Sequence, residues 1–155
     1  MNNRLFIHEM STGRNTEILR EFDENKNVVK WDPKGIYFTA LKRTKSLLYL
    51  YRPGSSDIKE VPTNLDLTGQ VSLSKDGLKM AVNGRSYSSL NEVYMGSPGE
   101  SLTQLTKMTS QISGWNLPLN EIITWKSKDG TEIEGVLIKP SNYDPKKKYP
   151  LLIVI

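Results

Sequence analysis

The chain has 155 residues, of which 37% are hydrophobic and 25% charged, and it carries a formal net charge of +4. This composition is typical of a folded globular chain and excludes a disordered or collagen-like one, and the mild positive charge falls short of a nucleic-acid-binding signature. Cysteine is absent and the only histidine is His8, which excludes disulfides, thiolate nucleophiles, zinc–thiolate sites and metal sites built on several imidazoles.

The hydropathy of the sequence argues against a membrane partner. The longest apolar run, residues 151–155, has five residues, far fewer than a transmembrane helix needs. The first eight residues lack the apolar core of a signal peptide. We therefore expect no membrane interaction and favour a cytoplasmic location.

Short strands recur along the chain at a regular spacing. Residues 5–7, 48–50 and 93–95 share an apolar–aromatic–apolar pattern, at offsets of 43 and 45 residues. Each is followed by a stretch rich in Gly, Ser, Thr or Pro and then by a second short strand, which is the pattern of a β-hairpin.

The segments upstream of the second and third copies also match each other. In both, a strand leads into a Gly-containing turn and a return strand, at Gly35 and at Gly77. We predict four-stranded antiparallel units over residues 28–62 and 69–107, and the last two strands of an earlier unit over residues 4–20. A period of about 40–45 residues with four strands is the signature of β-propeller blades.

The predicted blades do not close a ring. Propellers typically have about 4–8 blades, whereas this chain offers about two and a half. Blade faces and strand edges would stay open, and such edges pair readily with other chains. We therefore expect the isolated chain to self-associate or to be part of a longer protein.

The pattern changes after residue 108. Residues 109–119 are polar and read as a linker, and Asp129-Gly130 between two alternating strands predicts a hairpin. Residues 141–150 form a loop with three consecutive lysines. The continuous apolar run 151–155 predicts a strand buried on both faces, as in an α/β sheet.

These segments together resemble a known family. The stretch 121–140, with its Asp-Gly turn and Lys-Pro end, followed by Lys-Tyr-Pro and the apolar run, is similar to the domain junction of the prolyl oligopeptidase family. It is most similar to the acylaminoacyl-peptidase and dipeptidyl-peptidase-like branch. The turns Trp31-Asp-Pro-Lys-Gly35 and Leu73-Ser-Lys-Asp-Gly77 resemble variants of that family's blade turn.

The resemblance implies a mainly β fold with a partial β-propeller at residues 1–108. A linker at 109–119 and the first strands of an α/β-hydrolase domain at 120–155 would follow. It implies a fragment of a serine peptidase that cleaves short peptides near their N-termini, with the propeller as a size filter. In the family, the His-Gly-Gly segment, the Gly-x-Ser-x-Gly elbow, the acid and the triad histidine all lie further downstream. We therefore expect this chain to contain no catalytic residue and to be inactive alone.

The residues themselves offer no competing catalytic site. The stretch Gly84-Arg-Ser-Tyr-Ser88 ends in serine and lies in a predicted blade hairpin, so we interpret it as a polar loop. His8 lies on a strand with no supporting serine–aspartate pair, and a partly exposed packing position is the better interpretation. Turn chemistry explains Asp76-Gly77 and Asp129-Gly130 better than metal binding does.

The remaining candidates are interpreted as surface or packing residues. Lys146–Lys148, with Lys126 and Lys139, could attract phosphate, but Tyr143 and Tyr149 alone do not make a stacking platform for nucleic acid. Trp31 and Trp115 are expected to pack within blade and linker. Glu24 and Arg85 lie near strand ends and receive no substrate role.

The sequence thus predicts no cofactor, no metal and no nucleic-acid partner, and a short peptide as the substrate of the full-length protein. The alternative is a non-enzymatic propeller module that binds a protein or ligand through its rim loops. A carbohydrate-binding or oligomer-binding propeller is a third reading, which aromatic residues clustered on one rim would favour.

Overall fold

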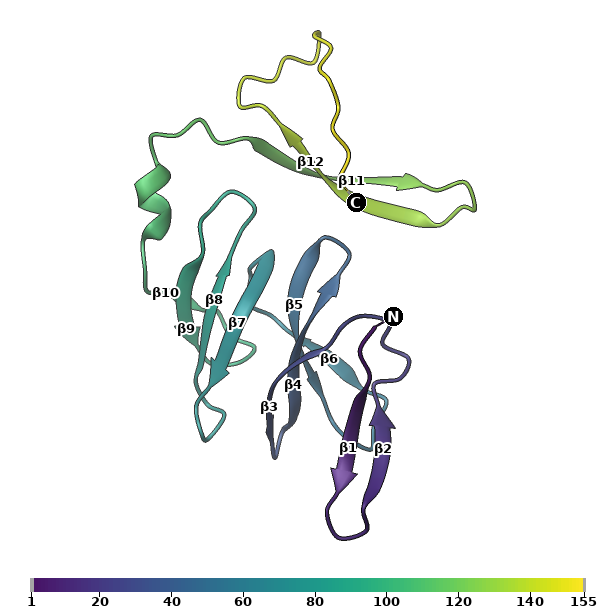
Figure 1. Ribbon diagram of the computed structural model, residues 1–155. Helices are drawn as coiled ribbons and strands as arrows, with labels where there is room; N and C mark the ends of the chain where they lie inside the picture. Colours follow the sequence, from purple (N-terminus) through teal and green to yellow (C-terminus); the bar gives the residue numbers. More distant parts are fainter. Residues whose placement is uncertain (1, 155) are drawn as a thin grey trace.

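The computed structural model describes residues 2–154 as an almost entirely β structure (Figure 1). In this part of the chain, ten strands precede a short 3-10 helix, and two strands follow it. The ten strands are β1 (Leu5–Glu9), β2 (Arg14–Ile18), β3 (Asn27–Asp32), β4 (Gly35–Lys42), β5 (Lys45–Tyr51), β6 (Ile58–Val61), β7 (Leu67–Leu73), β8 (Met80–Arg85), β9 (Glu92–Gly96) and β10 (Thr103–Gln104). No helix in this part of the chain is long and apolar enough to cross a membrane.

The two predicted four-stranded units are present. Strands β3 to β6 pair in chain order as antiparallel neighbours, and so do β7 to β10. A single parallel pairing, Ser46 with Leu67, links β5 to β7 and connects the two units into one ladder. Strands β1 and β2 form a separate hairpin.

Glycine is required at the β3–β4 turn. Gly35 has a φ of 142°, and a Cβ there would lie 2.4 Å from the carbonyl oxygen of Tyr51 on β5. Asp32 accepts a hydrogen bond from the Lys34 amide at 2.8 Å, which tightens the same turn. The close approach lets β4 pair with β5 from its first residues onward.

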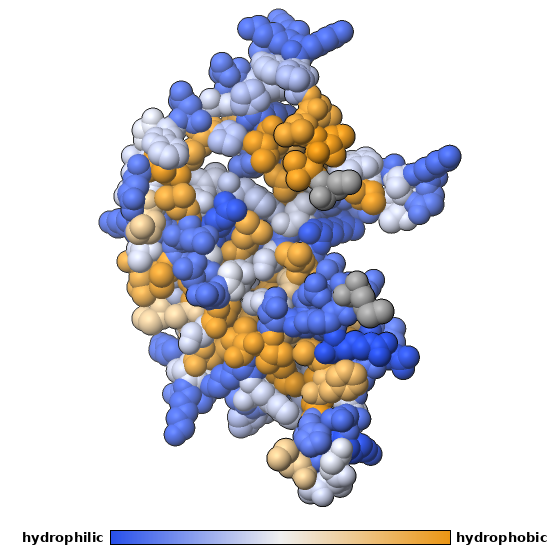
Figure 2. Space-filling view, viewed as in Figure 1, coloured by the Kyte–Doolittle hydropathy of each residue, from blue (hydrophilic) through white to orange (hydrophobic). Residues whose placement is uncertain are grey.

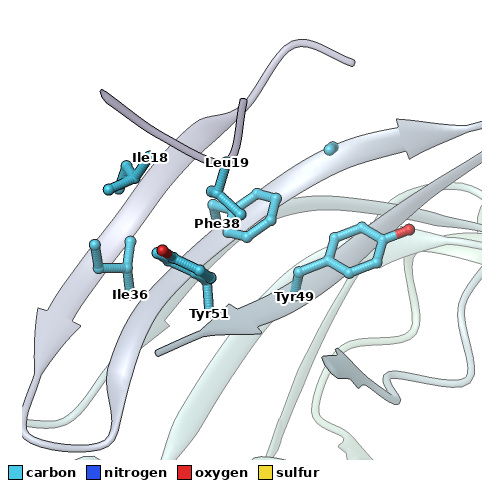
Figure 3. Packing of buried hydrophobic residues seen from close by; sticks show 7 residues of the cluster. Ile18, Leu19, Ile36, Phe38, Tyr49 and Tyr51 are labelled. Carbon is cyan, nitrogen blue, oxygen red and sulfur yellow. The ribbon is translucent and has the colours of Figure 1, made fainter. Parts of the chain in front are cut away.

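Strands β4 and β5 are buried on both faces. One face packs against β1–β2 through a cluster of Ile18, Leu19, Ile36, Phe38, Ala40, Tyr49 and Tyr51 (Figure 3). The rings of Phe38 and Tyr49 stack there at 5.3 Å, and Phe22 meets both edge-on. Since successive residues of a strand point to opposite faces, Tyr37 and Leu48 project the other way.

The other face of β4 and β5 packs against the unit β7–β10. We call the units β3–β6 and β7–β10 the first sheet and the second sheet. Tyr37, Leu48, Val61 and Leu65 form a cluster with Met80 and Val82 of β8. The first sheet is therefore the middle of three layers, between the β1–β2 hairpin and the second sheet. This agrees with the expectation that the units stack face to face.

Two lysines add polar contacts between the stacked sheets. The Lys30 ammonium donates hydrogen bonds to the carbonyl oxygens of Ser74 and Lys75, and Lys34 donates to that of Gly77 at 3.0 Å. The turn after β3 thus contacts the turn after β7.

The C-terminal part differs from the sequence prediction in two places. The expected linker 109–119 contains most of a 3-10 helix, η1 (Met108–Ile112), and its last residue begins β11 (Leu119–Lys126). Strand β11 pairs with β12 (Glu132–Lys139) around the predicted Asp129-Gly130 turn.

The prediction of a buried strand at 151–155 is wrong for residues 151–154. They form no strand, and their side chains are 73–86% exposed. None of the described strands pairs with them, so no neighbouring strand covers these side chains or supplies their backbone hydrogen bonds. Hydrophobic surface near the yellow C-terminal segment is visible in Figure 2. Ile155 lies outside the described residues.

Because the first sheet is buried on both faces, we expect truncation of a side chain within it to destabilise the chain. Leu48→Ala should lower the free energy of unfolding by about 2–5 kcal/mol, because Leu48 is fully buried between the sheets. Leu41→Ala, on the adjacent strand but 54% exposed, is the matched control and should change it by less than about 0.5 kcal/mol. Urea unfolding followed by tryptophan fluorescence measures both, and equal effects would contradict the layered core.

Candidate functional site

His8 and the serines of residues 84–88 do not form a nucleophile–base pair. The Nδ1 atom of His8, on exposed β1, lies 2.8 Å from the side-chain oxygen of Asn15 on β2. The hydroxyls of Ser86 and Ser88 lie 3.4 Å apart, and Ser86 also donates to Ser89 at 3.1 Å. These groups are engaged in local polar contacts within a strand pair and a loop.

The two Asp-Gly pairs form the same turn. Both belong to the tetrapeptide Ser-Lys-Asp-Gly, and in both the aspartate accepts hydrogen bonds from the serine hydroxyl and from the amide two residues later. Gly77 and Gly130 adopt φ values of 67° and 87°. The hydrogen bond from the Ser127 hydroxyl, with that from the Thr131 amide, lowers the pKa of Asp129 to about 2. These carboxylates organise turns.

The lysine-rich loop at residues 141–150 is held by contacts among its own residues and with Lys139 of β12. The rings of Tyr143 and Tyr149 lie 5.3 Å apart, and the Lys139 ammonium is 5.0 Å from the centre of the Tyr143 ring. The Tyr149 hydroxyl accepts a hydrogen bond from the Asp144 amide at 3.0 Å. The two tyrosines therefore face each other instead of offering two free stacking surfaces.

The expected packing of Trp31 and Trp115 is wrong. Their side chains are 58% and 69% exposed. Trp115 borders a small cavity of about 200 Å³ that Arg85 also lines, whereas Glu24 lines a different cavity beside Tyr49. The structure does not bring Glu24 and Arg85 into one site.

The most organised polar site lies where the β11–β12 hairpin meets the sheets. In Figure 1 the hairpin lies above the β4–β5 turn. The Glu134 carboxylate accepts hydrogen bonds from the Thr44 hydroxyl at 2.6 Å and from the Thr44 amide at 3.3 Å. The Arg43 guanidinium lies 3.0 Å from Glu132 and 3.4 Å from Glu134.

A second contact comes from the loop between β8 and β9. The Tyr87 hydroxyl donates to the carbonyl oxygen of Thr44 at 2.6 Å, and the Tyr87 carbonyl accepts from the Asn120 side chain of β11 at 3.0 Å. Thr44 therefore forms hydrogen bonds both with Glu134 of the hairpin and with Tyr87 in the β8–β9 loop of the second sheet. We call Arg43, Thr44, Tyr87, Asn120, Glu132 and Glu134 the junction network.

A cavity of about 560 Å³ lies beside the junction network, between the β4–β5 turn and the β6–β7 connection. Its charged side chains are arranged as ion pairs: Lys42 with Glu60 at 3.8 Å, Lys45 with Asp66 at 3.2 Å, and Arg43 with Glu134. The hairpin supplies one wall through Glu134.

The charges of the junction network reinforce one another. The hydrogen bond from the Thr44 hydroxyl lowers the pKa of Glu134, desolvation opposes this, and the Thr44 amide and Arg43 lower it further. Hydrogen bonding to Glu134 and the charge of Glu132 raise the pKa of Arg43. The pairing therefore persists as an ion pair at neutral pH.

Glu92 holds the connection that leads to the hairpin. It is 1% exposed, and it accepts hydrogen bonds from the Thr106 hydroxyl at 2.5 Å and from the amides of Met108 and Thr109 at 2.9 and 2.6 Å. Burial alone would raise the pKa of Glu92, but these hydrogen bonds outweigh it and lower the pKa from 4.5 to about 2. The carboxylate fixes the first turn of η1.

Glu92 makes the stability of the chain depend on pH. Because its folded pKa lies below its unfolded value, its stabilising effect is full above about pH 4.5 and disappears as the pH falls towards 2. Glu92→Gln should melt at a lower temperature than the wild type at pH 6, and the gap should narrow between pH 4.5 and 2.

Thermal melts of both proteins across this range, followed by circular dichroism, measure the gap. Glu121→Gln serves as the control, because Glu121 is exposed and pairs with Lys139 within the hairpin. A Glu92→Gln gap that stays constant with pH would contradict the assignment.

Sequence reasoning missed the junction network. One signal was available: Glu132 and Glu134 are two residues apart on a predicted strand and so share a face. Their partners, Arg43 and Thr44, are about 90 positions away in a turn, and only the stacking of the sheets brings that turn to the hairpin.

Comparison with known proteins gives two relatives. No family model matches the chain. It is 26% identical over 154 residues to dipeptidyl-peptidase 5 of Porphyromonas gingivalis, which covers 97% of this chain and 22% of that protein. It is 42% identical over 59 residues to dipeptidyl aminopeptidase A of Saccharomyces cerevisiae, which covers 36% of this chain and 6% of that protein. The chain thus spans about a fifth of the length of the first relative.

The chain is therefore a mainly β protein that is similar over nearly its whole length to a dipeptidyl peptidase. The two relatives confirm the resemblance to the dipeptidyl-peptidase-like branch of the prolyl oligopeptidase family.

Proposed function

We propose that the chain is part of a propeller-gated serine peptidase that removes short units from the N-termini of peptides. The observation that carries this is the match to dipeptidyl-peptidase 5 over 97% of a chain whose two four-stranded antiparallel units pack against each other. In this proposal β3–β6 and β7–β10 are two blades, and β1–β2 is the outer half of a third. The hairpin β11–β12 opens the α/β-hydrolase domain.

The role of these residues in the complete enzyme is to shape and limit access to the substrate cavity. Acyl transfer needs a nucleophile held against a general base and donors directed at the developing oxyanion. Residues 1–155 contain no Gly-x-Ser-x-Gly, and their only histidine is hydrogen-bonded to Asn15. The nucleophile, acid and base of the proposed reaction therefore come from other sequence, and the blades act by excluding large substrates.

The proposal predicts different labelling of two proteins by a fluorophosphonate probe. The 155-residue chain should remain unlabelled and should not hydrolyse dipeptidyl p-nitroanilides. The product of the complete coding region should be labelled on one serine within a Gly-x-Ser-x-Gly segment and should hydrolyse them. Heat-denatured samples of both are the control for non-specific labelling.

Two outcomes would reject this assignment. Stoichiometric labelling of the 155-residue chain would demand a catalytic site within it. A complete product that takes up no probe and has no serine elbow would favour the non-enzymatic module that binds through its rim loops.

We further propose that the isolated chain self-associates through its exposed apolar C-terminal segment. The side chains of residues 151–154 are 73–86% exposed and contiguous, and such patches favour association. The open strand edges of the hairpins add sites for pairing.

Light scattering coupled to size-exclusion chromatography tests this proposal. The wild-type mass should rise with protein concentration, and the double variant Leu152→Asp/Val154→Asp should shift the chain towards monomer. Leu105→Asp, at an exposed position before η1, should leave the wild-type behaviour unchanged. A wild-type chain that stays monomeric at every concentration would contradict the proposal.

A further inference from the structure

The β4–β5 turn has an unusual residue at its tip. Arg43 adopts a φ of 57°, in the left-handed region that two-residue hairpin turns normally fill with Gly, Asn or Asp. An arginine there is strained relative to glycine, because its Cβ crowds the backbone. We therefore expect the arginine side chain to make a stabilising contact that offsets this backbone strain.

The contact is made with the hairpin. The Arg43 guanidinium reaches both carboxylates on one face of β12, Glu132 at 3.0 Å and Glu134 at 3.4 Å. The neighbouring Thr44 gives Glu134 two further hydrogen bonds. Charge-assisted hydrogen bonds to a half-buried carboxylate are stronger than an exposed ion pair.

Apolar packing does not hold the hairpin on the sheets. Neither hydrophobic cluster of the described residues includes a side chain from β11 or β12. Leu119, Ile122, Trp125 and Ile138 are each at least 40% exposed. A two-stranded hairpin without such packing is only marginally stable in water, so its order depends on the polar contacts that seat it.

We propose that the junction network is a latch that seats the β11–β12 hairpin on the two sheets. Arg43 and Thr44 hold β12 through Glu132 and Glu134, and the Tyr87 carbonyl holds β11 through the Asn120 side chain. The hairpin opens as a unit when the contacts of Arg43 and Thr44 are lost. Opening removes the Glu134 wall of the 560 Å³ cavity. The inference rests on these contacts and is independent of the proposed peptidase function.

Amide hydrogen exchange of the 155-residue chain tests the latch without any measurement of activity. Glu134→Ala should accelerate exchange in β11 and β12 by about tenfold or more, because the lost hydrogen bonds are charge-assisted. Exchange in β4 and β8 should remain at the wild-type rate. Glu121→Ala is the matched control, since it removes a carboxylate of the same hairpin that pairs within the hairpin.

The variant Arg43→Gly distinguishes opening of the hairpin from destabilisation of the whole chain. Glycine relieves the positive φ, so β4 and β5 should exchange at the wild-type rate or more slowly, while the hairpin exchanges about tenfold faster. All variants are compared at one protein concentration. Unchanged hairpin exchange in both Glu134→Ala and Arg43→Gly overturns the proposal. Equal acceleration in the hairpin and the sheets also overturns it, because the effect would then be global.

Discussion

The alternation of side chains along β4 and β5 is the constraint on which the rest of the structure depends. Phe38 and Tyr49 point to one side, Tyr37 and Leu48 to the other, and all four are buried. A sheet with two apolar faces needs a layer on each side. The β1–β2 hairpin covers one face and the second sheet covers the other, which fixes the order of the layers. Repetition of such layers is the physical basis of stacked repeat units, in which each contacts only its neighbours.

The C-terminal hairpin is attached to the sheets by polar contacts and not by burial of apolar side chains. Its side chains belong to neither hydrophobic cluster of the described residues, and Arg43, Thr44 and Tyr87 contact it through ion pairs and hydrogen bonds. Polar contacts of this kind are directional, so they define the orientation of the hairpin relative to the sheets. The chain therefore combines a stack held by burial with an attachment held by geometry.

The similarity to dipeptidyl-peptidase 5 extends over the stacked sheets and the C-terminal hairpin alike. The match covers nearly the whole chain, and these residues correspond to about a fifth of that relative. Three acidic side chains of the chain accept hydrogen bonds that stabilise local structure. Asp76 and Asp129 close identical Ser-Lys-Asp-Gly turns, and Glu92 caps the 3-10 helix from within the second sheet.

The sequence by itself determined the local structure. The spacing of Leu48-Tyr-Leu50 and Val93-Tyr-Met95, with Gly35, Gly77 and Gly130 at the turns, predicted the strands and the two four-stranded units, because strand period and turn chemistry are properties of neighbouring residues. The tertiary structure decided what depends on distant partners. It left the apolar residues 151–154 exposed without a paired strand, and it left Trp31 and Trp115 at the surface. It also brought Arg43 to Glu132 and Glu134, since a contact across about 90 residues exists only once the sheets have stacked.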